Sequence, residues 1–137
     1  MPNRQQLITW AAATLRESAW APVSVVVLYL IGLKFHLYDL FPPLDVPTHF
    51  LGGVAITYFY RSAIKHSQGF AGNVPGGVQV LLAITCTGTT TVLWEFYEYV
   101  MDSYFGQRMM LGLADTTKDM LMGLLGALVL SVFYRRR

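Results

Sequence analysis

Charged side chains are scarce in this sequence: they make up 13% of its 137 residues, whereas 54% of the residues are hydrophobic. The mean hydropathy is correspondingly positive, at +0.44. A soluble domain of this size needs many polar residues to cover its surface, so this balance predicts an integral membrane protein. The single cysteine, Cys86, excludes an internal disulfide. The sequence also lacks a basic face interleaved with aromatic residues, so nucleic acid is not an expected partner.

The apolar residues gather in four stretches of membrane-spanning length. They cover residues 19–38, 47–64, 78–100 and 116–134, and each is long enough to cross a ~30 Å hydrocarbon core as a helix. Residues 1–18 mix polar and apolar positions, which predicts a short interfacial helix. The expected fold is therefore an all-α polytopic membrane protein. An N-terminal interfacial segment, 1–18, precedes a single four-helix transmembrane domain, 19–137.

The basic residues outside these stretches indicate the orientation of the chain. Arg4 and Arg16 precede the first span, Arg61 and Lys65 lie near the connection between the second and third, and residues 135–137 are all arginine. With four spans, these segments fall on one side of the membrane. Because basic residues concentrate on the cytoplasmic side, both termini are expected in the cytoplasm and the protein in the inner (cytoplasmic) membrane. Membrane lipids are then its expected partners.

Acidic side chains gather at the opposite, outer end of the predicted helices. Residues 67–94 carry no charge, and the same predicted helix then presents Glu95, Glu98 and Asp102. Spaced three and four apart, these acids share one helix face. The starts of the second and fourth spans supply further polar groups at the same depth, namely Asp45, His49, Asp115 and Asp119. Three separate helices thus present titratable groups at one end of the predicted bundle.

Such a cluster requires something to offset its charge. A carboxylate that faces lipid unpaired costs roughly a few kcal/mol, and carboxylates brought together also repel one another. Either some of them are protonated or a cation lies among them. We predict a divalent cation held by a set of four residues: His49, Glu95, Glu98 and Asp119. Oxygen-rich ligands favour Mg²⁺, Mn²⁺ or Ca²⁺, and one histidine with carboxylates also suits Zn²⁺.

Structural roles remain open for several of these residues. Asp45 suits a turn before a proline, Asp115 suits a helix N-cap, and Asp102 suits a solvated helix end. Arg108 and Lys118 could neutralise the acids as structural ion pairs. In that alternative the acids would hold the helices together without binding a ligand.

The acids and their neighbours also resemble the motifs of a known group. The motifs are Asp45 and His49-Phe50 at a helix start, Glu95 with Glu98 on a mid-chain helix, and DTTKDMLMGLLGA at 115–127. Over residues 45–127 this pattern is similar to the VanZ-like small bacterial membrane proteins, and more closely to their YjdF-like relatives. Val46, Glu98 and Gly123 depart from the usual Lys, Gln and Asn. The resemblance implies a small bacterial integral membrane protein, and the best-known member is linked to glycopeptide-antibiotic tolerance.

The position of the cluster suggests a class of substrate. A cation at the outer interface could engage a lipid-linked or phosphate-bearing envelope substrate, with Arg108 as a second contact. We expect Asp45, Asp102 and Asp115 to line the same substrate site. No nucleophile is evident, so no catalytic residue is predicted. Two other functions remain open: a proton- or cation-coupled carrier, and a non-catalytic membrane subunit whose acids form structural ion pairs.

Overall fold

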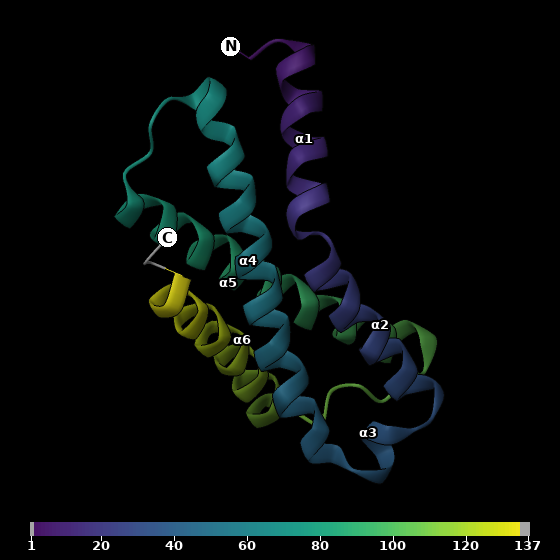
Figure 1. The fold of residues 1–137 in the computed structure, drawn as a ribbon. Helices are drawn as coiled ribbons and strands as arrows, with labels where there is room; N and C mark the ends of the chain where they lie inside the picture. The colour runs from purple at the N-terminus through teal and green to yellow at the C-terminus, as the bar shows by residue number, and fades with distance from the viewer. Residues whose placement is uncertain (1, 135–137) are drawn as a thin grey trace.

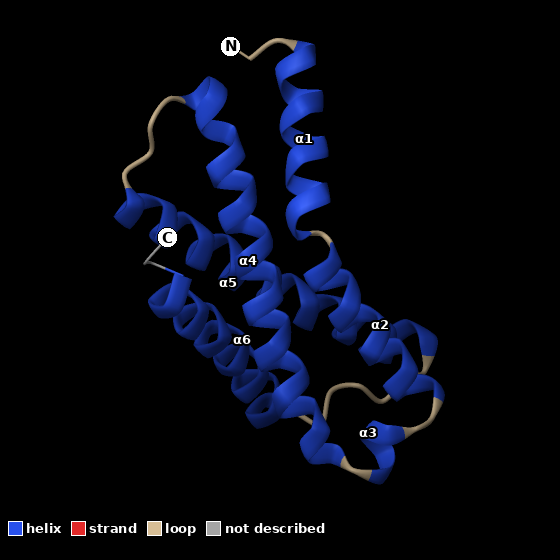
Figure 2. Ribbon diagram, viewed as in Figure 1, coloured by secondary structure: helices blue, strands red, loops and turns tan. Residues whose placement is uncertain are grey.

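The structure is a computed structural model that describes residues 2–134, and no strand occurs among these residues (Figure 1, Figure 2). Its elements are α1 (Arg4–Ser18), α2 (Trp20–Lys34), the short α3 (Leu37–Leu40), the 3-10 helix η1 (Pro42–Leu44), α4 (Asp45–Ala71), α5 (Gly76–Phe105) and α6 (Leu113–Tyr134). The predicted all-α class is therefore confirmed.

α1 and α2 follow α4 along its length as a bent pair (Figure 1). Their axes differ by 55° at a break at Ala19, which is where the sequence divides the predicted interfacial segment from the first span. The Trp10 indole on α1 donates a hydrogen bond of 2.8 Å to the Ala63 carbonyl on α4. Glu17 binds Lys65 and His66 of α4 at 2.9 and 2.6 Å. The first helix therefore packs on the second half of α4.

The first predicted span, 19–38, ends early in the structure. α2 stops at Lys34, and the chain reverses through His36, whose φ of 54° lies in the left-handed region. That conformation is uncommon for a residue other than glycine and does not continue a right-handed helix. The chain then enters α3 and η1, which lead into α4.

Composition accounts for two or three of the four predicted spans. Within residues 2–134, α5 and α6 are long and apolar enough to cross a membrane, and the α1–α2 pair adds a third if it counts as one span. α4 has 27 residues but fails this criterion, because polar residues such as His49 and Arg61 lower its hydropathy. α4 packs against α1, α2, α5 and α6, so neighbouring helices cover much of its polar surface.

Small residues bring α4 and α6 into close contact. A Cβ added to Gly53 would collide with the carbonyl group of Gly123, and one added to Gly126 would collide with the carbonyl of Phe50. Close approach of this kind is typical of helices that meet through glycine in membranes. His49 and Asp119 lie four residues, about one turn, before Gly53 and Gly123. The glycine contact therefore sets the two side chains on adjoining helices at a similar level.

The interior of the bundle is mostly polar and its exterior mostly apolar. The buried hydrophobic residues are largely alanine, whereas the buried polar residues include Thr57, Thr87, Thr91 and Ser131 on α4, α5 and α6. Leucine, valine and phenylalanine side chains are exposed along the outer faces of the helices. This distribution is the reverse of that in a water-soluble domain and suits a chain whose outer surface meets lipid.

Candidate metal centre

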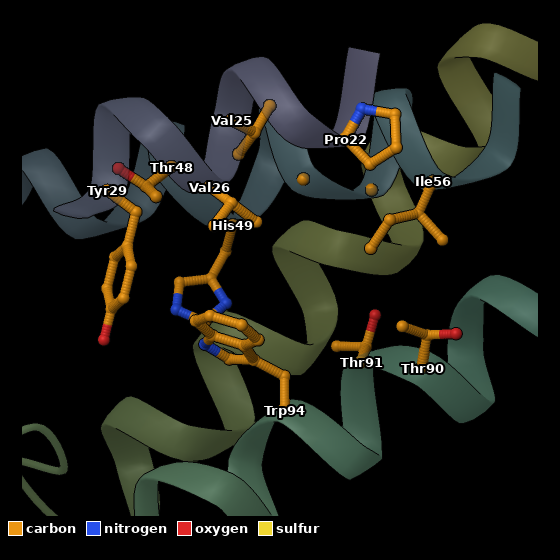
Figure 3. A pocket seen from close by; sticks show the side chains of 12 residues that line it. Pro22, Val25, Val26, Tyr29, Thr48, His49, Ile56, Thr90, Thr91 and Trp94 are labelled. Carbon is orange, nitrogen blue, oxygen red and sulfur yellow. The ribbon is translucent and has the colours of Figure 1, made fainter. Parts of the chain in front are cut away.

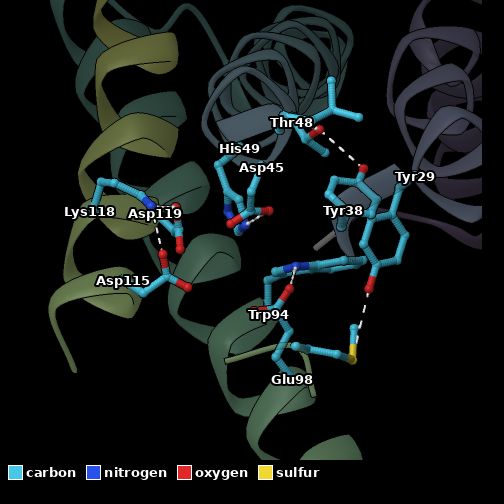
Figure 4. Close-up of polar contacts among 12 residues, drawn as sticks. Tyr29, Tyr38, Asp45, Thr48, His49, Trp94, Glu98, Asp115, Lys118 and Asp119 are labelled. Carbon is cyan, nitrogen blue, oxygen red and sulfur yellow. Dashed lines mark hydrogen bonds and ion pairs between the residues drawn. The ribbon is translucent and has the colours of Figure 1, made fainter. Parts of the chain in front are cut away.

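His49 on α4 has a carboxylate on each side of its imidazole ring. Its Nε2 lies 3.3 Å from Oδ1 of Asp45, one turn earlier on the same helix (Figure 4). Its Nδ1 lies 3.8 Å from Oε1 of Glu95 on α5. The histidine side chain is only 7% exposed. Asp45 thus orients the ring so that Nδ1 faces the acids of α5, the arrangement by which a carboxylate commonly positions a metal-binding histidine.

Glu95 and Glu98 lie on the buried face of α5, and each is 5% exposed. Their hydrogen bonding differs. Oε1 of Glu98 accepts a bond of 2.8 Å from the indole N–H of Trp94 (Figure 4). Neither carboxylate oxygen of Glu95 has a hydrogen-bond partner among residues 2–134. A buried carboxylate without hydrogen-bond partners is unfavourable in its charged form, so Glu95 is either protonated or offset by a positive charge.

Asp119 extends the cluster to α6. It is 2% exposed, and its Oδ1 has no hydrogen-bond partner in the described part of the chain. Nζ of Lys118 lies 3.8 Å from Asp119 but only 2.6 Å from Asp115 (Figure 4). Because Lys118 is 41% exposed and bonded to Asp115, solvent screens much of its effect on the buried acid.

These residues are geometrically able to hold a metal ion. One group consists of His49, Glu95 and Glu98, and the other of Asp45, His49 and Asp119. In each group, one ligand atom per residue lies within 4.8 Å of the others. Two ligands on one ion at bonds of 2.0–2.5 Å are at most about 5 Å apart. The structure thus brings His49, Glu95 and Glu98 within ligand distance of one another. It places Asp119 in a second group, with Asp45, and the two groups share only His49.

The other residues expected at a substrate site lie around this cluster. The oxygens of Asp102 accept hydrogen bonds of 2.8 and 2.9 Å from the backbone N–H groups of Met109 and Met110. Asp102 therefore holds the α5–α6 loop. Asp115 binds Lys118. Arg108 is exposed in the α5–α6 loop, and no ion pair involves it within residues 2–134.

Two cavities adjoin the cluster. The larger, about 570 Å³, is lined by residues of the chain connections and by site residues that include Asp45, Glu98, Arg108 and Asp115. The smaller, about 90 Å³, lies between α2, α4 and α5 (Figure 3). Most of the side chains that line it are apolar, and His49 also lines it. Tyr29 lines both. A large cavity that contains charged side chains and a small, mainly apolar cavity therefore meet the site.

Sequence reasoning missed the aromatic wall of the site. Trp94 donates to Glu98 and packs edge-to-face on Tyr29, with the ring centroids 5.1 Å apart. The four-residue spacing of Trp94 and Glu98 was the available signal, because such residues are neighbours on a helix. Tyr29 had no comparable signal, since it comes from a distant helix.

Sequence reasoning also missed most of the buried hydroxyl groups. Thr57 on α4 and Thr87 on α5 meet at 2.8 Å between their Oγ1 atoms. Thr87 and Thr91 precede Glu95 at four-residue intervals and share its buried helix face. The four-residue spacing of these side chains was visible in the sequence. Their burial was not, because it depends on how the neighbouring helices pack against α5.

Comparison with known proteins gives one match. The sequence model of a family described as "Predicted membrane protein (DUF2238)" matches residues 10–137, which is most of the chain. The comparisons with curated proteins and with solved structures give no match. The description names a membrane location and no activity, and the resemblance to VanZ-like and YjdF-like proteins is not confirmed by it.

Proposed function

Because the chain belongs to this family of predicted membrane proteins (DUF2238), and its apolar helices fit a multi-pass membrane location, we propose that it binds a divalent cation. His49, Glu95, Glu98 and Asp119 are the ligands. The observation that carries the proposal is Glu95, whose two carboxylate oxygens are buried and have no hydrogen-bond partner among residues 2–134. A cation among these groups supplies the positive charge that the nearby side chains do not.

The ligands have separate parts in this proposal. Nδ1 of His49 faces Glu95, and Glu98 completes the group on α5. Asp45 orients the imidazole from its other side. Asp119 adds a carboxylate from α6. One nitrogen with several carboxylate oxygens suits Mg²⁺, Mn²⁺, Ca²⁺ or Zn²⁺.

The proposed substrate is a phosphate-bearing lipid of the cell envelope, which this site binds or acts on. Its support is the pair of cavities: the larger contains Arg108 and acidic residues, and the smaller is apolar and contains His49. A cation and an arginine are the usual ligands of a phosphate group. An amphipathic molecule would therefore place its head group in the larger cavity, beside the charged side chains, and part of its chain in the smaller, apolar one.

The proposal includes four spans with both termini in the cytoplasm, which places the cluster at the outer face of the cytoplasmic membrane. α4 supports this topology because it begins directly after η1, which follows α2 and α3, and its far end leads into α5. It also lies among the helices that meet the span criterion. In this proposal, α4 crosses the membrane with these neighbours.

The decisive experiment measures the metal content and thermal unfolding of the protein purified in detergent. A cation that binds only the folded state raises Tm by an increment that grows with the logarithm of its free concentration. Glu95→Gln with Asp119→Asn should remove both the bound metal and this increment. Without added cation, the double variant should unfold at the same or a higher temperature than the wild type, because it lacks uncompensated buried charge.

Asp39→Asn is the matched control, because Asp39 is an acid in the α2–α4 connection whose side chain is 74% exposed. It should keep the metal and the full Tm increment. If no divalent cation changes Tm, and the double variant is strongly destabilised, the acids are structural and the non-catalytic subunit is the better reading.

The buried hydroxyl groups favour a second candidate, the proton- or cation-coupled carrier. Threonines and serines continue along the interior from Thr91 to Ser131. Reconstituted vesicles distinguish the two functions. A carrier moves protons or the cation across the bilayer at a rate that Glu95→Gln abolishes, whereas a binding protein leaves the vesicle interior unchanged.

A further inference from the structure

Arg61 lies at the end of the bundle opposite the acidic cluster and is buried there without an anionic partner among residues 2–134. It is 8% exposed, and its Nη1 has no hydrogen-bond partner among residues 2–134. The guanidinium carbon lies 5.1 Å from the centre of the Tyr134 ring on α6. An aromatic ring attracts a cation, but it accepts no ordinary hydrogen bond from the N–H groups in the guanidinium plane.

The acidic side chains of the protein do not supply the missing partner. The sequence has eight of them, and only Glu17 lies at the Arg61 end. Glu17 binds Lys65 at 2.9 Å and His66 at 2.6 Å. The remaining acids lie on α3, at the start of α4, at the end of α5 and at the start of α6: Asp39, Asp45, Glu95, Glu98, Asp102, Asp115 and Asp119. The position of Arg61, twelve residues beyond His49, separates it from that cluster by about 18 Å along α4.

We propose that Arg61 is the centre of an anion site that binds a phosphate group at this end of the bundle. A buried arginine without an ionic partner is unfavourable, and its planar fork of N–H groups matches the oxygens of a phosphate. Ser131 precedes Tyr134 by one helical turn, and its buried Oγ also has no partner in the described residues. Directly after Tyr134 the sequence has three further arginines.

The phosphate comes from either an anionic lipid head group or the free ion. Basic pockets between helices at the cytoplasmic face of membrane proteins bind lipid phosphates, and Arg61 lies between α4 and α6 where Tyr134 ends α6. This site is independent of the acidic cluster, because no residue belongs to both.

Thermal unfolding in a phosphate-free detergent tests the proposal with three probes: dioctanoyl phosphatidylglycerol, dioctanoylglycerol and inorganic phosphate. Phosphatidylglycerol should raise Tm in a saturable way, whereas dioctanoylglycerol, which has the same chains and no phosphate, should not. In Arg61→Met the affinity for phosphatidylglycerol should fall by about tenfold or more, as expected for losing a hydrogen bond to a charged group. A response to inorganic phosphate as well identifies the ion itself as a ligand, and a response to the lipid alone identifies the head group.

Two controls separate binding from folding and from net charge. Arg61→Lys keeps the positive charge but not the planar fork, so it should retain a weakened response. Arg16→Met removes an exposed basic residue of α1 and should respond as the wild type does. The divalent-cation increment should be unchanged in Arg61→Met, which keeps this proposal separate from the metal site.

Three results would overturn the phosphate site. The first is an Arg61→Met variant that responds to phosphatidylglycerol as strongly as the wild type. The second is an equal Tm rise with dioctanoylglycerol. The third concerns the terminal carboxylate of the chain: if a short Gly-Ser extension after Arg137 destabilises the wild type but not Arg61→Met, then that carboxylate is the partner of Arg61.

Discussion

Gly53 on α4 and Gly123 on α6 meet backbone to backbone, and no side chain separates their helices at this point. On each helix the contact lies one turn after the site residue: Gly53 follows His49 by four residues, and Gly123 follows Asp119 by four residues. Thr91 of α5 packs on the same place, since a Cβ added to Gly123 would lie 2.7 Å from its Oγ1. The three helices that supply the predicted metal ligands are therefore in contact with one another one helical turn away from the ligands.

Gly53→Ala should destabilise the protein by about 1–3 kcal/mol, the usual cost of overpacking a tight core. Its Cβ would meet backbone atoms, which cannot move aside as a flexible side chain can. Equilibrium unfolding in detergent measures this loss. The variant should also weaken cation binding, because separating α4 from α6 moves His49 away from Asp119.

Gly52→Ala is the matched control, because it lies on the same helix and an added Cβ there meets nothing within 4 Å. Its stability should be unchanged or raised by up to about 1 kcal/mol, the preference of alanine over glycine within a helix. Equal destabilisation by both substitutions would show that α4 and α6 do not meet at Gly53.

Trp94 should report on cation binding through its hydrogen bond to Glu98. The chain has three tryptophans, so Trp10→Phe with Trp20→Phe leaves Trp94 as the sole indole. Mn²⁺ should quench its fluorescence in a saturable way as the ion binds beside Glu98. Adding Glu98→Gln should abolish saturation at the same Mn²⁺ concentrations, because glutamine removes the negative charge while its oxygen still accepts the indole hydrogen bond.

A protein that retains only Trp20 serves as the control for this measurement. Trp20 is 64% exposed and packs on Tyr58, away from the acidic cluster. It should show only weak quenching, proportional to Mn²⁺ concentration. The same saturable quenching at Trp20 and Trp94 would place the bound ion elsewhere.

Lys118→Met should strengthen cation binding at the acidic cluster. Its ammonium lies 3.8 Å from Asp119 and competes with any bound cation. Because the lysine is partly exposed, the gain should be small, up to about fivefold in affinity for an interaction of at most ~1 kcal/mol. Isothermal titration with Mn²⁺ measures it. A large loss of stability with no gain in affinity would support structural ion pairs instead.

The sequence predicts the acidic cluster better than it predicts the first two helices. Helical spacing placed Glu95 and Glu98 on one face, and span counting placed Asp119 at the same end. The early stop of α2 depends on the left-handed backbone of His36, which no composition signal marks. The packing of α1 on α4 depends on contacts of Trp10 and Glu17 with residues more than forty positions away, so local patterns could not indicate it.

The polarity of α4 shows why span counting is harder for a central helix. His49 and Arg61 lower its hydropathy, yet both are largely covered by other helices. The apolar composition of α5 and α6 is enough to identify each of them as a candidate membrane span. A helix enclosed by other helices does not need an apolar composition, because its neighbours provide the apolar surface that faces lipid.

Labelling of single cysteines should decide whether α4 crosses the membrane. In a Cys86→Ala background, cysteines replace three exposed residues: His36 in the connection after α2, Asn73 between α4 and α5, and Gln107 between α5 and α6. If α4 and α5 both cross, positions 36 and 107 label from outside intact cells with a membrane-impermeant maleimide. Position 73 then labels only after the membrane is opened. Labelling of positions 36 and 73 from the same side would mean that α4 does not cross, and labelling of position 73 alone from outside would invert the proposed orientation and put the acidic cluster at the cytoplasmic face.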